Sequence, residues 1–309
     1  MVCARQDDSE GSPVSQMRIT VLGTSASAPT TERGLPAVLL EYLGEGFLFD
    51  VGEGTQRQFM RFGRSFMRVT NIFISHYHGD HVFGLPGLLS TMALYGRSRP
   101  VHVWAPERQV VYVERFLRSL VPNLPFPVEF HPAAPGELFS TGDYSVRAYS
   151  LDHTVDTLAY VFEESPRIKA DKEKLRKYGL HGPVVGKLKA GECVEWNGRR
   201  ICPEDVVYSV PGRKIVYVAD TRPVLSDLAR NANVLIHEAT FMHSDHDLAV
   251  EKKHSTVAEA AHVAAELNVG RLILYHFSPR IKDLSAVVEE AEKYFTPVVA
   301  AEDGYTLEI

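Results

Sequence analysis

Residues 72–81 are IFISHYHGDH, a segment in which a short apolar strand is followed at once by three histidines and one aspartate. Imidazole and carboxylate groups suit Zn²⁺ and similar metals. Without a metal, His76, His78, Asp80 and His81 would each need a separate partner or water, so a solvated histidine loop is the weaker explanation. The segment therefore indicates the active site of a metal-dependent hydrolase.

The same segment holds ligands for more than one ion. An open catalytic metal site uses about three protein ligands and keeps one position for water. His76 and His78 can share one metal, and Asp80 and His81 can share a second. We therefore expect two metals whose remaining ligands come from later in the chain.

Three later residues of metal-binding types stand just beyond expected strands: His153 after residues 145–150, Asp220 after 215–219 and His276 after 272–275. Taken singly, each could be a turn residue or a hydrogen-bonded histidine. Polar residues that follow apolar strands are suited to form a site at one edge of a sheet. Together the three residues complete two sites, with Asp220 suited to bridge them.

Strands and helices alternate along most of the chain. Apolar runs predict strands at 18–22, 38–42, 46–51, 71–75, 101–104, 145–150, 159–162, 214–219, 233–237, 271–276, 297–300 and 305–308. Helical spacing predicts helices at 55–67, 84–95, 107–120, 256–267 and 284–295. This alternation favours an α/β architecture with sheets at the centre.

The bulk composition excludes several classes of protein. With 309 residues, 45% of them hydrophobic and 23% charged, the chain can bury a large core, which is typical of a globular enzyme. A net charge of −6 excludes a polycation, so any nucleic acid would need a local basic surface. No apolar run approaches the ~20 residues of a membrane-spanning helix, and no membrane partner is expected.

The ends and the cysteines complete the expected organisation. Residues 1–16 are polar and lack the apolar centre of a secretory signal, so we expect a disordered extension or a start codon placed upstream of Met17. Residues 17–309 are expected to form the catalytic domain. The three cysteines, Cys3, Cys193 and Cys202, contain no C-x-x-C pair, which predicts neither a disulfide framework nor a cysteine zinc finger and favours a reducing cytoplasm.

Residues 165–203 differ in character from the rest. Residues 167–189 include eight Lys and Arg residues and only two acidic residues, a local excess of six positive charges in an acidic protein. Glycines and a proline at 179–186 predict a projecting, irregular arm inserted into the catalytic domain. The alternative is an ordinary solvated loop. The candidate RNA-binding residues of the arm are Lys169, Lys172, Lys174, Arg176, Lys177, Lys187 and Lys189.

The pattern H-x-H-x-D-H, with His153, Asp220 and His276 following in order, resembles the metallo-β-lactamase superfamily. The resemblance implies an αββα sandwich of two mixed sheets with a dinuclear metal site at one edge. It implies two Zn²⁺ per subunit, with Mn²⁺ as an alternative. It assigns the ligands to the first metal (His76, His78, His153), to the second (Asp80, His81, His276) and to the bridge between them (Asp220).

Further segments resemble the ribonuclease Z family of tRNA 3′-processing endonucleases. They are FDVGEGTQRQ at 49–58, HEATF at 237–241, HST at 254–256, HFSPR at 276–280 and the glycine-rich basic part of the arm at 180–191. One loop departs from the family pattern P-x-K-x-R-N, because Thr31 and Gly34 replace its Lys and Asn whereas Pro29 and Arg33 match.

The resemblance implies hydrolysis of precursor tRNA after the discriminator base, leaving a 3′-hydroxyl on the tRNA. Asp80 would act as general base, and His254, oriented by Glu238, would protonate the leaving 3′-oxygen. Arg280 would contact RNA. The alternative for His254 is a helix-start residue beside an N-cap at Ser255. The family also implies a homodimer in which the arm of one subunit serves the active site of the other.

Two other interpretations stay open at this point. A small-molecule hydrolase of the same superfamily, such as a phosphodiesterase, arylsulfatase or lactonase, would share the seven ligands but need no basic arm. A non-catalytic RNA-binding scaffold would need no complete ligand set. The histidine- and aspartate-rich run at 243–247 is expected to be an exposed loop outside the metal site.

Overall fold

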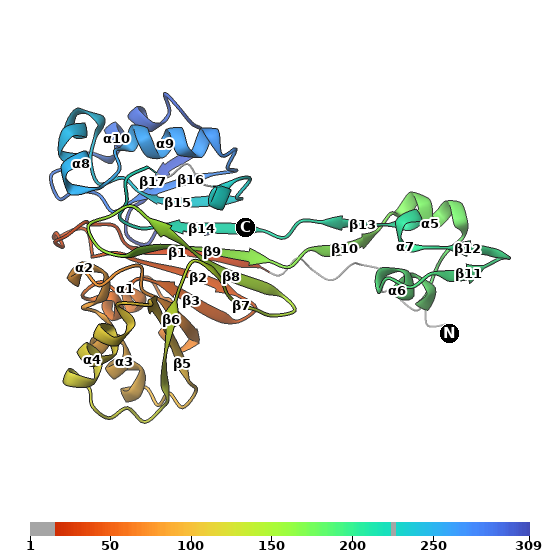
Figure 1. The fold of residues 1–309 in the computed structure, drawn as a ribbon, viewed down its shortest axis with the longest axis horizontal. Helices are drawn as coiled ribbons and strands as arrows, with labels where there is room; N and C mark the ends of the chain where they lie inside the picture. The colour runs from red at the N-terminus through yellow and green to blue at the C-terminus, as the bar shows by residue number, and fades with distance from the viewer. Residues whose placement is uncertain (1–15, 224–226) are drawn as a thin grey trace, which may run out of the picture.

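The computed structural model describes residues 16–223 and 227–309, so the extension expected at residues 1–16 lies almost wholly outside the described residues. Two mixed sheets of seven strands each pack face to face, and helices cover both outer faces (Figure 1). This arrangement confirms the αββα sandwich. No helix among the described residues is long and apolar enough to span a membrane.

The first sheet has the order β18-β1-β2-β3-β4-β5-β6, and the strands from β3 to β6 are parallel. Its strands are β1 (Met17–Gly23), β2 (Ala37–Tyr42), β3 (Glu45–Phe49), β4 (Val69–Phe73), β5 (Val101–Pro106), β6 (Val128–Ala133) and β18 (Thr306–Glu308). The neighbouring helices are α1 (Thr55–Arg61), η1 (Phe66–Arg68), α2 (Gly79–Val82), α3 (Leu85–Leu94) and α4 (Val110–Leu120).

The second sheet has the order β17-β16-β15-β14-β9-β8-β7, and β14 to β17 are parallel. Its strands are β7 (Gly136–Ser140), β8 (Tyr144–Leu151), β9 (Thr157–Glu164), β14 (Lys214–Val218), β15 (Val234–Glu238), β16 (Leu272–Tyr275) and β17 (Val298–Ala300). The accompanying helices are η2 (Asp227–Ala229), η3 (His243–Asp245), α8 (His246–Lys252), α9 (Val257–Glu266) and α10 (Leu284–Ala291).

The core lies in three layers, one between the sheets and one under each set of helices. Strands such as β16 (LILY) are buried along their whole length, because both faces of the sheet are covered. Between the sheets, Phe49 stacks on Tyr217 at 5.2 Å and on Phe73 at 5.3 Å between ring centroids. These rings tie β3 and β4 to β14 directly beneath the edge at which the histidines gather.

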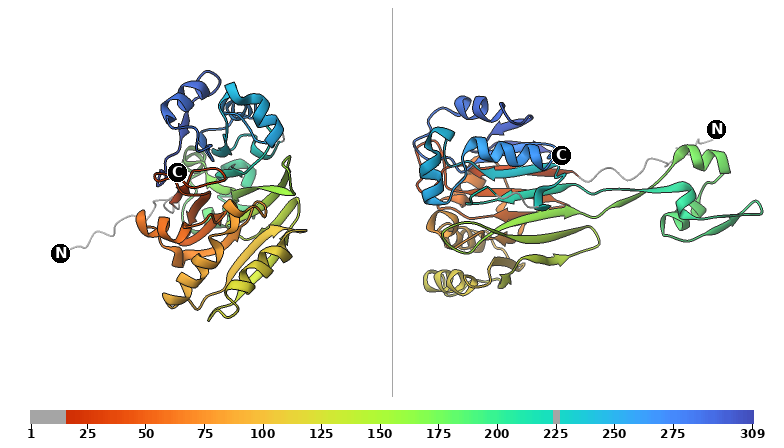
Figure 2. Two further views of the ribbon diagram at one scale, coloured as in Figure 1. Left: turned by 90° about the vertical axis from the view of Figure 1, so that its left-hand side faces the viewer. Right: turned by 45° about the horizontal axis from the view of Figure 1, so that its top comes forward.

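The basic arm projects from the sandwich as a folded unit (Figures 1 and 2). It contains β10 (Arg167–Ala170), α5 (Lys172–Tyr178), α6 (Pro183–Lys189), β11 (Val194–Trp196), β12 (Arg199–Ile201), α7 (Pro203–Val206) and β13 (Val207–Val210). The expectation of an irregular arm was wrong, because Leu180, Leu188, Ile201 and Val206 form a small core of their own. The return strand β13, which pairs with β10, lies beyond residue 203.

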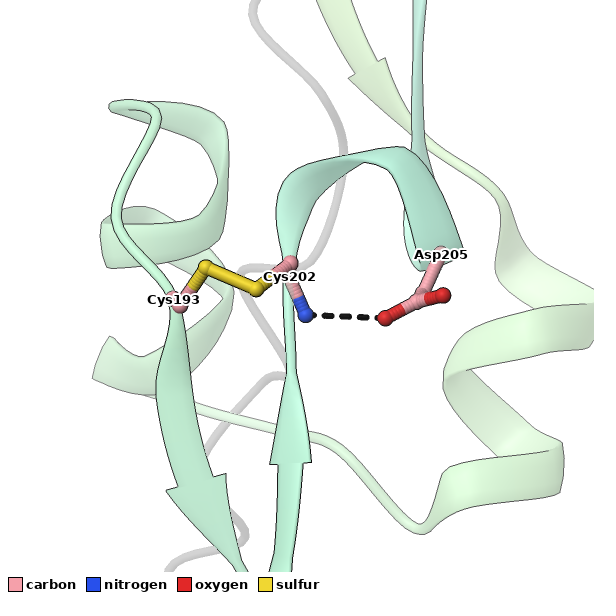
Figure 3. The surroundings of a disulfide bond; sticks show 3 residues. All are labelled: Cys193, Cys202 and Asp205. Atoms are coloured by element: carbon pink, nitrogen blue, oxygen red, sulfur yellow. Dashed lines mark hydrogen bonds between the residues drawn. A yellow bond between two sulfur atoms is a disulfide. The ribbon is translucent and has the colours of Figure 1, made fainter.

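The arm also contains a disulfide, which corrects the inference from the cysteine count. Cys193 and Cys202, nine residues apart, flank the β11–β12 hairpin and are bonded to each other (Figure 3). The Cys202 N–H donates to Asp205 Oδ2 at 2.9 Å, which anchors the start of α7 to the bridge. The cysteines therefore no longer argue for a reducing compartment.

Several expected boundaries shift for local reasons. The helix expected over 55–67 ends at Arg61, because Gly63 takes a positive φ of 62°. Strand β6 was missed because its polar sequence contains Pro132, which an edge strand tolerates. The run 243–247 is exposed at most positions as expected, but it forms η3 and the start of α8 rather than a loop.

Candidate metal centre

The segment 76–81 lies where β4 ends and its chain turns into the short helix α2. Gly79 opens that helix, and a Cβ at this position would lie 2.4 Å from the Phe83 ring. The tight turn directs His76, His78, Asp80 and His81 toward the edge where β14, β15 and β16 also end. Parallel strands end at one edge of a sheet, which explains why His153, Asp220 and His276 meet them there.

All seven predicted ligands come together in two groups. His76, His78, His153 and Asp220 offer ligand atoms within 4.8 Å of one another, and so do Asp80, His81 and His276. Asp220 stands between the groups. Its Oδ2 lies 3.7 Å from Nε2 of both His76 and His153, and its Oδ1 lies 3.4 Å from His81 Nε2 and 3.1 Å from His276 Nε2. Each carboxylate oxygen of Asp220 therefore faces a different group of candidate ligands.

Four atoms in this cluster are buried without a hydrogen-bond partner: His81 Nε2, His153 Nε2, His276 Nε2 and Asp220 Oδ1. A buried polar atom without a partner is costly, so several in one place need a common explanation. The three nitrogens lie 3.1–3.7 Å from an oxygen of the Asp220 carboxylate. Imidazole nitrogens and carboxylate oxygens are ligands of divalent metals, so the residues fit such ions.

The opposite nitrogen of four of these histidines is held in place. His81 Nδ1 lies 2.7 Å from Asp50 Oδ2, and His276 Nδ1 lies 2.9 Å from Thr240 Oγ1. His76 Nδ1 lies 3.0 Å from Ser75 Oγ, and His153 Nδ1 lies 3.0 Å from the Lys253 carbonyl oxygen. Such contacts orient an imidazole and leave its other nitrogen free for a metal.

Asp50 lies in the FDVGEGTQRQ segment, but the sequence analysis assigned it no role. It is fully buried, accepts hydrogen bonds from the Ser75 N–H and Oγ at 2.7 Å each, and accepts another from Tyr217 OH at 2.7 Å. An aspartate directly after an apolar strand, inside the FDVGEGTQRQ segment, was the available signal. Its role as the support of His81 depends on a contact between residues far apart in sequence.

Burial and charge set the protonation states of the cluster. Burial holds the pKa of His76 well below its usual range and lowers the pKa of His78 and His153, so these imidazoles are neutral, the form that binds metal. Burial alone would raise the pKa of Asp220, but the imidazoles of His276 and His81 hold it well below its usual range. Asp220 is therefore ionised.

His254 and Glu238 lie together beside the cluster, as the sequence suggested they could. His254 Nδ1 is 3.0 Å from Glu238 Oε1 and 3.2 Å from Thr240 Oγ1. Burial would lower the pKa of His254, but the Glu238 carboxylate raises it to about 9. Glu238 is itself held by the N–H groups of Thr221 and Ser255, each at 3.0 Å from Oε1.

The N-cap at Ser255, which belonged to the alternative interpretation of His254, was wrong. Helix α9 begins at Val257, and its N-cap is Thr256, whose side chain accepts from the Glu259 N–H while the Glu259 carboxylate accepts from the Thr256 N–H. Ser255 Oγ instead donates to the Thr221 carbonyl oxygen at 2.7 Å. His254 is therefore held outside the helix, with Arg222 donating to its carbonyl oxygen.

A pocket of about 440 Å³ opens over the cluster and is lined by His78, Asp80, His153, Asp220, His254 and Arg280, among others. Asp80 Oδ2 accepts from the Ser27 N–H at 2.8 Å. The exposed Arg280 is the one RNA-binding candidate placed at this pocket. A larger hollow of about 1010 Å³ lies beside Arg33 and Asp303 and contains none of the seven ligands.

The seven basic candidates of the arm lie elsewhere. All are exposed, on β10, α5 and α6, and among the described residues none pairs with a carboxylate. The arm leaves the sandwich after β9 and returns before β14, whereas His153 precedes β9 and Asp220 follows β14. The arm and the metal centre therefore lie at opposite edges of the same sheet (Figure 1).

This sandwich, with its histidine and aspartate cluster at one edge, defines a protein of the metallo-β-lactamase fold. The metallo-β-lactamase fold protein YhfI from Bacillus subtilis has this fold, with a TM-score of 0.70, 17% identity and coverage of 96% of this chain and all of that one (100%). The ribonuclease Z of Archaeoglobus fulgidus is 41% identical over 304 residues, which is 94% of this chain and 97% of the relative. The chain belongs to the ribonuclease Z family.

Other comparisons agree over nearly the full length. The ribonuclease Z of Myxococcus xanthus is 39% identical and covers 96% of this chain and 99% of the relative. Human tRNase Z, short form, superposes with a TM-score of 0.69 at 30% identity, covering 94% of this chain and 98% of that one. A family model described as Anti-Pycsar protein Apyc1 matches residues 17–171. That match ends where the arm begins, so it covers the H-x-H-x-D-H motif but not most of the arm.

Proposed function

We propose that this chain is a metal-dependent endoribonuclease that removes the 3′ trailer of precursor tRNA. It would hydrolyse the phosphodiester after the discriminator base and leave a 3′-hydroxyl on the tRNA. The observation that carries the proposal is the Asp220 carboxylate set between two groups of candidate metal-ligand atoms, in a chain of the ribonuclease Z family. We propose a cytoplasmic location because the proposed substrate is tRNA, and the cysteines carry no part of this argument.

We infer that the centre holds two Zn²⁺, with Mn²⁺ as the alternative that the same ligands accept. His76, His78 and His153 would hold one ion, Asp80, His81 and His276 the other, and Asp220 both. When bound, the pair would lower the pKa of a water and neutralise charge on the phosphate.

The protein groups around the pocket supply the proton transfers. Asp80 is ionised because His81 and His276, with imidazole nitrogens at 3.6 and 3.7 Å from its Oδ2, hold its pKa below the usual range against the effect of burial. It can accept a proton from the attacking water. His254, protonated through Glu238, can donate a proton to the leaving 3′-oxygen.

The arm is proposed to grip the RNA. Its exposed lysines and arginines can contact phosphates of a folded RNA without selecting a base sequence. Strand β9 has eight residues, so the base of the arm lies ~25 Å from the metal centre along the sheet. Because the arm also points away from the centre, we propose a homodimer in which each arm serves the partner's active site.

The decisive assay uses a precursor tRNA with a 3′ extension. We expect one cut after the discriminator base with a 3′-hydroxyl on the tRNA, and cutting at other positions or of small phosphodiesters alone would overturn the proposal. Residues 167–210 can be replaced by a short turn, because β9 and β14 are antiparallel neighbours. The arm-less variant should lose tRNA cleavage but keep its metals.

Mixed dimers test which site the arm serves. One subunit would lack the arm and keep its metal centre, and the other would keep the arm and carry Asp220→Ala. Activity in the mixture, with neither variant active alone, is the expected result if the arm acts on the partner. An inactive mixture in which heterodimers have formed would show that each arm serves its own subunit.

A further inference from the structure

A second set of metal-ligand side chains lies far from the catalytic edge, on the outermost strands of the first sheet. His102 is on β5, and Glu129 and His131 are on β6. In the parallel pairing of these strands, His102 stands opposite Glu129 and Trp104 opposite His131. Because side chains alternate along a strand, all four share one face of the sheet.

The three ligand atoms form a small triangle. His102 Nδ1 lies 3.1 Å from His131 Nε2 and 3.3 Å from Glu129 Oε2, and the third side, from His131 Nε2 to Glu129 Oε2, is 3.9 Å. Ligands of a tetrahedral zinc ion, with bonds of about 2.0–2.1 Å, stand about 3.3 Å apart. One ion therefore fits over the triangle with little movement of any side chain.

The trio is also open to solvent. The side chains of His102, Glu129 and His131 are 37%, 50% and 30% exposed. In the described part of the chain, their three converging atoms make no hydrogen bond or ion pair outside the trio. A metal held there would keep its fourth position for water.

The site is independent of the catalytic centre. His102 pairs with Asn71 of β4, and His76 lies five residues further along the chain, ~16 Å in the direction of the strand. No residue belongs to both sets of ligands. Loss of one site should therefore leave the other intact.

We propose that His102, Glu129 and His131 form a surface site for one divalent ion of the borderline class, Zn²⁺ or Cu²⁺. Two imidazoles and one carboxylate suit these ions and disfavour Mg²⁺ and Ca²⁺. The bound ion would link the edge strand β6 to β5 through side chains as well as through the backbone.

Trp104 provides a direct readout. Its ring stacks on His131 at 4.4 Å between centroids and 22° between planes, and its Nε1–H donates to Asn71 Oδ1 at 3.1 Å. Cu²⁺ bound to His131 would quench the fluorescence of an indole at this distance. The chain has two tryptophans, and the other, Trp196, is in the arm. Trp196→Phe therefore leaves Trp104 as the sole reporter.

The experiment titrates Cu²⁺ into the full chain carrying Trp196→Phe and loaded with two equivalents of Zn²⁺, which the fuller ligand set of the catalytic centre takes up first. We expect saturable quenching at about one equivalent, competed by added Zn²⁺. His102→Ala and the nearly isosteric Glu129→Gln should each raise the Cu²⁺ concentration at half-quenching by at least about ten-fold. By metal analysis, the double variant His102→Ala/Glu129→Gln should bind one Zn²⁺ fewer than the parent and cleave RNA at the parent rate.

A quenching curve of either single variant that coincides with the curve of the parent would overturn the proposal, as would equal zinc content in parent and double variant. Glu129→Gln changes one atom, so a folded Glu129→Gln protein with parent quenching is sufficient for rejection. Neither result depends on RNA cleavage, so a failure here is distinguishable from a failure of the proposed nuclease function.

Discussion

The metal centre and the arm differ in how each is held together. At the candidate metal centre, five of the seven candidate ligand side chains are buried, and four histidines are oriented through their second nitrogen by residues such as Asp50 and Thr240. In the arm, the basic side chains are exposed on strand β10 and two short helices, and a four-residue core with one disulfide supports them. Chemistry at one edge requires fixed atoms, whereas binding of a polyanion requires only fixed charge.

Removal of the bridging carboxylate should have the largest effect. Asp220→Ala should release both ions, because Asp220 faces both groups of ligands, and should reduce cleavage by at least about 10⁴-fold, since the substrate phosphate loses its charge neutralisation. His153 belongs to only one group of ligands, so His153→Ala is the matched control and should release one ion. Metal analysis together with single-turnover cleavage checks this, and two ions retained in Asp220→Ala would refute the bridge.

Loss of the proposed acid should have the next largest effect. His254→Ala should keep both ions and slow cleavage by about 10²–10⁴-fold. A raised pKa of about 9 means that His254 is protonated below that pH and loses its proton above it, so the rate should fall at alkaline pH. Cations bound nearby would move this limb to lower pH. The fall in rate at alkaline pH should be absent in His254→Ala. A pH–rate profile of His254→Ala that matches the profile of the parent would exclude His254 as the proton donor.

Neutralising the arm should affect binding and not chemistry. Lys174→Ala/Arg176→Ala/Lys187→Ala should raise KM for precursor tRNA by about ten-fold or more. The slope of the logarithm of the binding constant against the logarithm of salt concentration should become shallower by the equivalent of up to ~3 phosphate contacts. The kcat value and the metal content should stay at the parent level. A variant with reduced kcat at saturating tRNA would show that the two regions are not separable in this way.

Breaking the disulfide should affect the arm alone. Cys193→Ser removes a link that closes a loop of about ten residues, worth ~2–3 kcal/mol of local stability. Hydrogen exchange should accelerate in residues 167–210 and remain unchanged at β14 to β16. Equal protection of the arm in the parent and in Cys193→Ser would mean that the small core of the arm stabilises it without the disulfide.

The base of the arm should show the smallest effect, visible in acid. Glu164, at the end of β9, is buried, and Arg213 donates to its carboxylate at 2.8 and 3.0 Å. Burial would raise the pKa of Glu164, but Arg213 lowers it to about 2. A lowered pKa in the folded state stabilises the protein above the ordinary value of 4.5, and this contribution is lost as pH falls toward 2.

Denaturant titrations of the parent and Glu164→Gln should therefore differ by ~1–3 kcal/mol at pH 6, and the difference should shrink below pH 4.5 and nearly vanish only as the pH reaches about 2. Arg230→Gln, whose exposed partner is Asp227, serves as a control that should show almost no difference. A constant gap between parent and Glu164→Gln at both pH values would exclude the ionised pair as its source.

Apolar patterning predicted the α/β class, and the family resemblance supplied the αββα sandwich. The seven candidate ligands could be proposed from the sequence because they stand shortly after apolar strands, whose ends converge at one edge of a sheet. Residues such as Asp50 and Thr240 could be located only after the strands were placed, since their contacts cross 31 and 36 positions. The trio on β5 and β6 could be recognised only once these two strands were paired, and the polar edge strand β6 is not visible in the apolar pattern of the sequence. The Cys193–Cys202 bond required the β11–β12 hairpin, which carries little hydrophobic signal.

The attachment of the arm has a consequence for how such a protein can change its substrate. The arm leaves from β9 and re-enters at β14, two adjacent antiparallel strands, so in topology it is an enlarged hairpin turn. Exchanging it for a short turn, or for another insertion, alters neither the order of the strands nor the positions of the seven ligands. Under the proposed function, target choice and bond cleavage would therefore be encoded in separable stretches of the gene, and one could evolve while the other is kept.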